Sequence, residues 1–204
     1  MTDEDATNRT GDDAIARYAE RVERSPHNLL SARGILELRT RHIPEASAFA
    51  RILPPGPGRV LDVGTGGGLP GVVVAILRPD LDVHVLEATS KKAAFLTGVS
   101  SELPGVFTVH SGRAEELVHQ SELRGAFDVV TARAVAPLER LAPLCVGFLR
   151  PEGRLYAIKG ARWPEELATA RGVIEKLGME VVTTPDDVDP VSPEPHVVIL
   201  QRRT

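Results

Sequence analysis

The stretch LDVGTGGGLPG, residues 61–71, places five glycines within eight positions, directly after an apolar segment. Glycine loses more conformational freedom on folding than any other residue, so such a cluster indicates that a ligand or another backbone comes very close. Two registers fit the cluster. Gly66, Gly68 and Gly71 match G-x-G-x-x-G, the dinucleotide-binding fingerprint. Gly64, Gly66 and Gly68 match the looser G-x-G-x-G that is typical of enzymes using S-adenosylmethionine (SAM).

Two carboxylates accompany the glycines. Asp62 lies just before the loop, where SAM enzymes often place an acid near the ammonium group of the ligand. Glu87 follows the next apolar segment, about 20 residues beyond the loop, where an acid can accept hydrogen bonds from both hydroxyls of a ribose. SAM and the nicotinamide dinucleotides both carry such a ribose, so Glu87 supports a nucleoside-containing ligand without choosing between them.

Other kinds of reaction centre have little support. The six histidines are scattered and Cys145 is the single cysteine, so nothing has the spacing of a metal site, and we expect no metal. No Ser/His/Asp or cysteine-centred nucleophile pattern stands out. His84 and His110 fall in expected strands, and we interpret them as structural. A lone cysteine also fits a reducing compartment.

Alternating strands and helices are expected to position these residues. Apolar runs of strand length lie at 59–63, 82–86, 106–110, 127–131, 154–159, 179–183 and 197–201, and helical segments at 70–77, 90–102, 114–119, 137–148 and 164–177. The alternation predicts an α/β fold, a Rossmann-like and mostly parallel sheet of seven strands with helices on both faces. The segment PDDVDPVSPEP has no helical period, so the last strand is expected to be antiparallel. Ligands bind at the carboxyl ends of strands in such sheets, which places the glycine loop at the ligand edge.

The 204 residues are expected to form one main domain with an N-terminal extension. Residues 1–13 hold five acids and one arginine, which predicts a disordered acidic tail. Residues 14–55 have helical spacing and end in the PPGPG break, so we expect a helical extension there and the main domain over 56–204. No apolar run approaches the ~18 residues of a membrane span, and the acidic N-terminus is unlike a signal peptide, so the expected location is cytoplasmic.

Arginines are concentrated in the expected extension. The net charge of the chain is −4, and residues 1–13 account for all of it, whereas residues 14–51 hold seven arginines against four glutamates. Such an excess fits an RNA-facing patch and fits a solvated helical face equally well, and the sequence leaves both open.

Several segments together resemble the bacterial 16S rRNA (guanine-N7) methyltransferases of the small subunit, also known as the glucose-inhibited division protein B family. These segments are NLLSARG, RHI, LDVGTGGGLPGVVVAILRPD, KKAAFL, SGRAEEL, FDVVTARAVAPL and LYAIKG. The similarity runs from Asn28 to His196, and DVGTGGGLPG together with TARAVAPL is highly specific. Glu87 stands where many members have aspartate, and the acidic tail is an addition.

The resemblance implies a class I SAM-dependent methyltransferase that acts on N7 of the guanosine at rRNA position 527, in the 530 loop. The expected partner is 16S rRNA, in the small ribosomal subunit or its precursor, with no membrane and no obligate protein partner. Taken with the glycine loop, the resemblance places SAM, and its product S-adenosylhomocysteine, against Asp62, Gly64, Gly66, Gly68, Leu69, Glu87, Ala114, Glu115 and Arg133. The expected catalytic residues are Arg133 and Lys159, and the expected RNA contacts are Arg33, Arg39, Arg41, His42 and Lys159.

This chemistry agrees with what the sequence lacks. Methyl transfer to guanine N7 needs no general base, because N7 carries a lone pair and no proton. After the fourth expected strand the chain holds TARA, not the D/N-P-P-Y motif frequent in enzymes that methylate exocyclic amines. Two alternatives remain, an NAD-dependent oxidoreductase and a non-catalytic module that senses SAM or a nucleotide. The expected sheet uses nearly all of the chain after residue 59, which leaves little structure for hydride-transfer groups.

Overall fold

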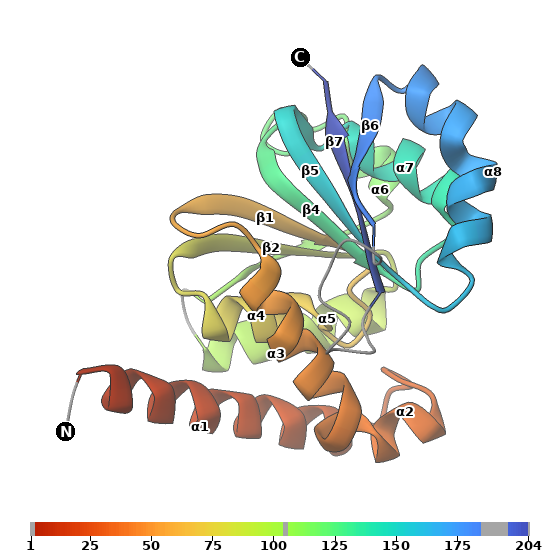
Figure 1. Ribbon diagram of the computed structural model, residues 1–204. Helices are drawn as coiled ribbons and strands as arrows, with labels where there is room; N and C mark the ends of the chain where they lie inside the picture. Colours follow the sequence, from red (N-terminus) through yellow and green to blue (C-terminus); the bar gives the residue numbers. More distant parts are fainter. Residues whose placement is uncertain (1–2, 104–105, 185–195, 204) are drawn as a thin grey trace.

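One seven-stranded sheet organises the protein (Figure 1). The computed structural model describes residues 3–103, 106–184 and 196–203. The strands are β1 (Gly58–Val63), β2 (Leu81–Glu87), β3 (Thr108–Ser111), β4 (Phe127–Arg133), β5 (Leu149–Lys159), β6 (Met179–Thr183) and β7 (His196–Arg202), in the spatial order β3-β2-β1-β4-β5-β7-β6. The first five pair in parallel, and β7 runs antiparallel to both β5 and β6. The expected fold class and the antiparallel last strand are therefore confirmed, while the PDDVDPVSPEP connection lies outside the described residues.

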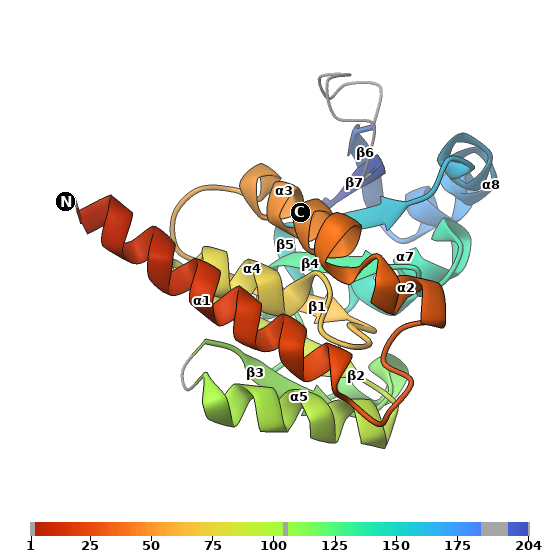
Figure 2. The same cartoon turned by 90° about the horizontal axis from the view of Figure 1, so that it is seen from below.

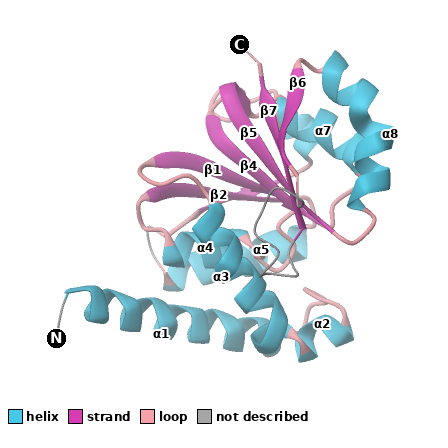
Figure 3. Cartoon of the chain, in the orientation of Figure 1, coloured by secondary structure: helices cyan, strands magenta, loops and turns pink. Residues whose placement is uncertain are grey.

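Helices cover both faces of the sheet (Figure 3). They are α1 (Asp3–Glu23), α2 (Ala32–Leu36), the π-helical turn η1 (Leu38–His42), α3 (Ile43–Ile52), α4 (Gly71–Leu77), α5 (Ser90–Glu102), α6 (Ala114–Leu117), α7 (Leu138–Val146) and α8 (Trp163–Lys176). Figure 2 shows α1 running along α4 on one face, with α5 beside them, whereas α7 and α8 lie on the other face. No helix of the described residues is long and apolar enough to cross a membrane.

The apolar residues of the strands divide between two cores. Side chains of successive strand residues point to opposite faces. Accordingly Val60 joins the cluster that includes Tyr18 and Phe49 of the N-terminal helices, whereas Leu61 joins the cluster that includes Phe148. Both faces of β1 are thus buried, as expected for a central parallel strand. The N-terminal helices share a core with the sheet, and their packing fixes where they stand relative to the ligand edge.

The N-terminus differs from the expectation. Helix α1 begins at Asp3, so residues 3–13, predicted to be a disordered tail, are helical in the structure. Acidic residues are favoured near a helix N-terminus, because the positive end of the helix dipole lies there. That preference is consistent with a helix that begins in an acidic segment. The division of the chain at residues 13 and 55 stays a prediction.

Candidate cofactor and substrate site

The glycine loop joins β1 to α4 at the carboxyl edge of the sheet. Backbone φ angles are +67° at Gly64, +64° at Gly66 and +109° at Gly68, values that glycine adopts without steric cost. Gly71 has no such angle, but a Cβ there would lie 2.7 Å from Cγ1 of Val85. The left-handed positions are therefore those of the G-x-G-x-G register, while Gly71 is needed for close packing of α4 on the sheet.

The loop leaves open space on one side. A Cβ at Gly66 would meet nothing within 4 Å, whereas a Cβ at Gly64 would lie 2.7 Å from Cγ2 of Val135. The hydroxyl of Thr65 is buried and lies against the Asp62 carboxylate, where it partly offsets the rise in the pKa of that carboxyl. A close backbone and an open side fit a ligand such as the methionyl part of SAM.

Asp62 lies fully buried beneath the loop. Its Oδ2 accepts a hydrogen bond from the N–H of Gly71 at 2.9 Å, and its Oδ1 accepts one from the hydroxyl of Thr131 at 2.8 Å. Burial raises the pKa of the Asp62 carboxyl above its usual range. The carboxylate has no exposed surface, and the expected approach of Asp62 to the ammonium of a ligand stays a prediction. In the structure, Asp62 ties β1, β4 and the start of α4 together.

Glu87 stands at the end of β2, beside the loop. Its Oε2 accepts from the N–H of Gly66 at 2.9 Å, and its Oε1 accepts from the N–H of Thr89 at 2.7 Å. A carboxylate has about four acceptor positions, so roughly two remain for the hydroxyls of a ribose. The carboxylate is held in place by backbone groups before any ligand arrives.

The other expected cofactor residues surround this point. The N–H of Gly112 donates to the carbonyl oxygen of Glu87 at 3.0 Å, which holds the turn before α6 against the end of β2. Ala114 is the first residue of α6 and is buried, whereas Glu115 is exposed in its first turn. Leu69 is buried at the end of the glycine loop. Ala114 and Glu115, the residues expected at the adenine, thus lie just beyond the turn that is held against Glu87, the residue expected at the ribose. Their contact with SAM stays a prediction.

Two residues of the N-terminal extension, Tyr18 and Leu29, reach the glycine loop, and neither was among the expected site residues. Tyr18 of α1 is buried, and its hydroxyl donates to the carbonyl oxygen of Gly67 at 2.9 Å. Burial raises the pKa of this hydroxyl far above its usual range. A Cβ at Gly67 would lie 3.2 Å from Cβ of Leu29. From the sequence, Tyr18 could be recognised only as an apolar position in a helical pattern, because its hydrogen-bond partner, Gly67, lies 49 residues away.

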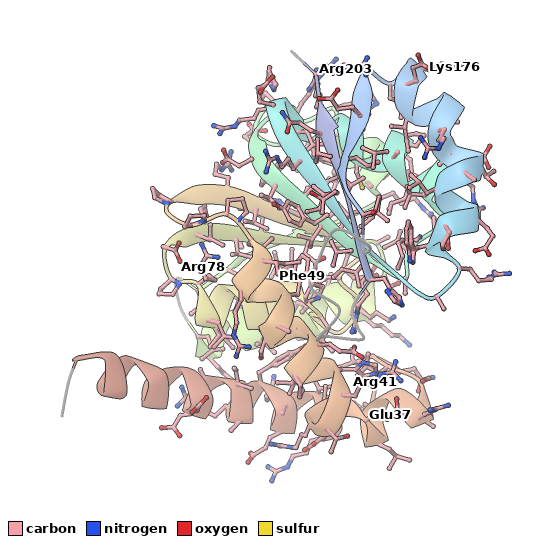
Figure 4. The ribbon with its side chains drawn as sticks, in the orientation of Figure 1. Glu37, Arg41, Phe49, Arg78, Lys176 and Arg203 are labelled. Carbon is pink, nitrogen blue, oxygen red and sulfur yellow. The ribbon has the colours of Figure 1, made fainter. Side chains whose placement is uncertain are left out.

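A pocket of about 610 Å³ opens beside the loop, between the N-terminal helices and the carboxyl ends of β4 and β5. Four of the expected site residues line it: Arg41, His42, Arg133 and Lys159. Figure 4 shows Arg41 on the N-terminal helices next to Glu37. The structure therefore brings the expected active-site residues of β4 and β5 together with part of the extension.

Two glutamates that the sequence reasoning missed also line the pocket. Glu45 places Oε2 3.5 Å from an Nη of Arg133 and 3.4 Å from Nδ1 of His42. Glu166 places Oε2 2.6 Å from Nζ of Lys159. The spacing of His42 and Glu45 on consecutive helical turns was a usable signal, whereas nothing local links Lys159 to Glu166.

Arg33 and Arg39, the two expected RNA residues that do not line the pocket, form ion pairs with glutamates, as Arg41 does. Arg33 contacts Glu37 at 2.6 Å, Arg41 contacts the same carboxylate at 2.8 Å, and Arg39 contacts Glu23 at 2.7 Å. The side chain of Arg33 is 81% exposed. These arginines form a solvent-facing network in which carboxylates already hold the guanidinium groups.

His84 and His110 lie together on β2 and β3. Their rings stack with centroids 5.1 Å apart, and the His84 ring meets Phe127 edge-on at 5.2 Å. Among the residues that the structure describes, no group of three or more His, Cys, Asp or Glu side chains is arranged to hold a metal ion.

Relatives with known names match most of the chain. A ribosomal RNA small subunit methyltransferase G from Mycobacterium marinum is 37% identical over 189 residues, covering 91% of this chain and 82% of the relative. Proteins of the same name from Sorangium cellulosum and Salinispora tropica are 42% and 44% identical over 77% and 68% of this chain. The chain spans only 66% and 58% of the lengths of those two relatives.

Solved structures share the fold at low sequence identity. TYW2 from M. jannaschii, solved in complex with AdoMet, has a TM-score of 0.59 at 15% identity, and the match covers 80% of this chain and 77% of that one. A MtNAS variant in complex with S-adenosylmethionine has a TM-score of 0.60 at 18% identity and covers 94% of this chain and 73% of its own. The model of the family described as rRNA small subunit methyltransferase G matches residues 13–196. The chain belongs to that family.

Proposed function

We propose that this protein transfers the methyl group of SAM to N7 of a guanosine in 16S rRNA, at position 527 in the 530 loop. The observation that carries the proposal is the position of the glycine loop, open at Gly66, beside the pocket that Arg133 and Lys159 line. Family membership supports SAM as methyl donor and rRNA as acceptor. The choice of guanine N7 rests on the resemblance of the motifs.

The chain offers a separate group for each part of SAM. The methionyl part fits the open side of the loop at Gly66, and Glu87 has acceptor positions free for the ribose. The adenine then falls toward the start of α6, where Ala114 and Glu115 lie. Bound SAM supplies an electrophilic methyl group on a positively charged sulfur.

The transfer is a direct displacement. The lone pair of guanine N7 forms the new bond to carbon as the carbon–sulfur bond breaks, and the electron pair of that bond stays on sulfur. N7 has no proton to lose, so the protein needs no general base there. Its contribution is to hold N7 in line with the methyl group, and alignment of this kind accelerates a reaction strongly.

Arg133 and Lys159 fit the role of holding the base at its edge. Arginine pairs readily with guanine O6, and a lysine ammonium can hold O6 or a phosphate. The methylated guanine is cationic, so free positive charge close to N7 would oppose the reaction. Glu45 and Glu166 lie 3.5 Å and 2.6 Å from the two cations and offset that charge.

The RNA outside the pocket is proposed to lie along the N-terminal helices. Arg33, Arg39, Arg41 and His42 are all in or beside α2 and η1, and Arg41 and His42 also line the pocket. A surface that continues from the pocket onto arginines suits a substrate whose phosphates extend beyond the reacting base.

The direct test is to map methylated nucleotides in 16S rRNA, using labelled SAM with small ribosomal subunits or protein-free rRNA. We expect one methylated guanosine, at N7, and no transfer when that guanosine is replaced by 7-deazaguanosine. The single-turnover rate should show no ionisation of a base near neutral pH. Methyl transfer to the 7-deaza analogue would exclude N7 as the acceptor.

Two variants and two ligands separate the proposal from its alternatives. Lys159→Ala should lower the transfer rate while sparing SAM binding, and Arg133→Ala should damage both. Full activity of the double variant would contradict the assigned roles. Calorimetry should show binding of SAM and not of NAD, which separates a methyltransferase from a dehydrogenase, and SAM binding without transfer would indicate a sensing module.

A further inference from the structure

Glu166 occupies a junction between α8, α7 and the pocket. Its Oε2 accepts a hydrogen bond from the N–H of Leu138, the first residue of α7, at 3.0 Å. The same oxygen lies 2.6 Å from Nζ of Lys159, at the end of β5. One carboxylate therefore joins the pocket lysine to the end of the segment that connects β4 to α7.

Lys159 holds the middle of that segment. Its Nζ donates to the carbonyl oxygen of Ala136 at 2.8 Å, and its side chain is only 7% exposed. An ammonium has three N–H donors, of which about one remains after the contacts with Ala136 and Glu166. Lys159 is thus mainly an anchor for residues 134–137, with one donor left toward the pocket.

The anchored segment has a backbone conformation that must be held. Ala134 has a φ of +56°, in the left-handed region, which is sterically unfavourable for any residue with a Cβ. Such conformations persist when the surrounding structure fixes them. The contacts of Lys159 and Glu166 come two and four residues later, on Ala136 and Leu138.

The segment forms a wall of the cofactor loop. Val135 is 37% exposed, and its Cγ2 would lie 2.7 Å from a Cβ at Gly64. Val135 therefore covers the first glycine of the loop on one side and faces the pocket on the other. A shift of this segment would change the distance between the SAM site and the base that receives the methyl group.

We propose that Glu166 is a positioning residue, which holds Lys159 and residues 134–137 so that Val135 separates and aligns the two sites. We call the contacts of Glu166 with Lys159 and Leu138, and of Lys159 with Ala136, the clamp. The effect on catalysis rests on the proposed function, whereas the clamp itself is present in the protein without ligands. Glu166 also keeps Lys159 electrically paired beside a base that becomes cationic.

The test compares Glu166→Gln with Glu165→Gln. Glu165 is exposed in the same first turn of α8, so it is a matched control for the loss of one carboxylate. We expect Glu166→Gln to lower kcat about 10-fold to 100-fold, because small misplacements of reacting groups carry losses of that size. The dissociation constant of SAM and the KM for rRNA should stay within about twofold, since Glu87 and the arginines are untouched.

A second readout needs neither SAM nor RNA. Hydrogen exchange of the peptide that contains residues 134–138 should become faster in Glu166→Gln and stay unchanged in Glu165→Gln, with thermal melting confirming that both are folded. Adding Ala134→Gly to Glu166→Gln should restore part of kcat, because glycine adopts the left-handed conformation without steric cost. Equal exchange and equal kcat in the two glutamine variants would overturn the clamp, and so would a loss of kcat that Ala134→Gly leaves unchanged.

The two proposals fail in different ways. If the protein places no methyl group on rRNA but Glu166→Gln still speeds exchange at residues 134–138, the clamp stands and the proposed function falls. If methylation is found and exchange does not respond to Glu166→Gln, the proposed function stands and the clamp falls.

Discussion

The two sides of the site are built by different means. On the cofactor side, backbone groups and buried carboxylates set the geometry: Asp62 and Glu87 accept hydrogen bonds from N–H groups of the glycine loop, and Tyr18 donates one to its carbonyl oxygen at Gly67. On the proposed RNA side, exposed arginines are paired with Glu23 and with the partly buried Glu37. Substitutions of the buried, hydrogen-bonded residues should therefore have large effects on binding or stability, whereas each exposed ion pair contributes little.

The largest effect is expected at Gly66. Gly66→Val should weaken SAM binding more than about 100-fold, because the side chain fills the open side of the loop, where the cofactor is proposed to lie. The measurement is calorimetry with SAM on protein shown to be folded by melting.

Gly56 provides the matched control for that substitution. It has a φ of +84° and also has nothing within 4 Å of an added Cβ, but it belongs to the PPGPG segment before β1. Gly56→Val should lose similar stability, about 1–3 kcal/mol for a left-handed β-branched residue, and keep SAM affinity. Equal SAM affinity in the two variants would remove Gly66 from the cofactor site.

The next effect is expected at Glu87. Glu87→Ala should weaken SAM binding by roughly 1.5–3 kcal/mol, because charge-assisted hydrogen bonds to the ribose are lost. S-adenosylhomocysteine carries the same ribose and should lose affinity equally. A loss confined to SAM would contradict the ribose role, because the two ligands differ only in the methyl group and the charge at sulfur.

This contrast explains what the sequence could predict. The need for glycine at positions 64, 66 and 68 is local, because it follows from backbone angles at those residues. The strand pattern likewise placed Arg133 and Lys159 at one edge of the sheet, and both line the pocket. The position of Asp62 beside the loop was likewise predictable, whereas its complete burial was not, because that burial depends on α4 packing above it.

Contacts between residues far apart in the chain could not be predicted from the sequence. The contacts of Tyr18 with Gly67 and of Lys159 with Glu166 join elements that meet only after folding. The excess of arginine in the extension was visible in the sequence, but the pairing of individual arginines was not, since Arg39 pairs with Glu23 across 16 residues. Composition therefore gives the net charge of this side and does not show which guanidinium groups are already paired.

A moderate effect is expected where the two sides meet, at Tyr18. Tyr18→Phe removes the hydroxyl that satisfies the buried carbonyl of Gly67, and should lower the free energy of unfolding by about 1–3 kcal/mol. SAM affinity should fall as well, because the loop loses a fixed point. Tyr156→Phe, at the other buried tyrosine, should leave SAM affinity unchanged. Equal SAM affinity in the two variants would show that α1 supports the fold and not the loop.

The smallest effects are expected in the exposed network. Charge reversal of Arg33, Arg39 and Arg41 should raise the KM for rRNA and flatten its salt dependence by about one unit of log–log slope per lost phosphate contact. SAM affinity should barely move, because these side chains do not touch the glycine loop. Unchanged turnover on rRNA across salt concentrations would identify the arginines as a solvated face.

Glu37→Gln removes a negative charge from the same group of ion pairs, whereas the charge reversal removes positive charges. Glu37 contacts both Arg33 and Arg41, and the hydrogen bond from Arg33 lowers the pKa of its carboxyl, so this glutamate is charged at neutral pH. An incoming phosphate must therefore compete with Glu37 for the two guanidinium groups. Removing the carboxylate charge frees Arg33 and leaves Arg41 paired with Glu45 alone, so rRNA should bind more tightly and with a steeper salt dependence. Because the arginines are intact in this variant, weaker binding would mean that Glu37 orients them for RNA and does not compete with it.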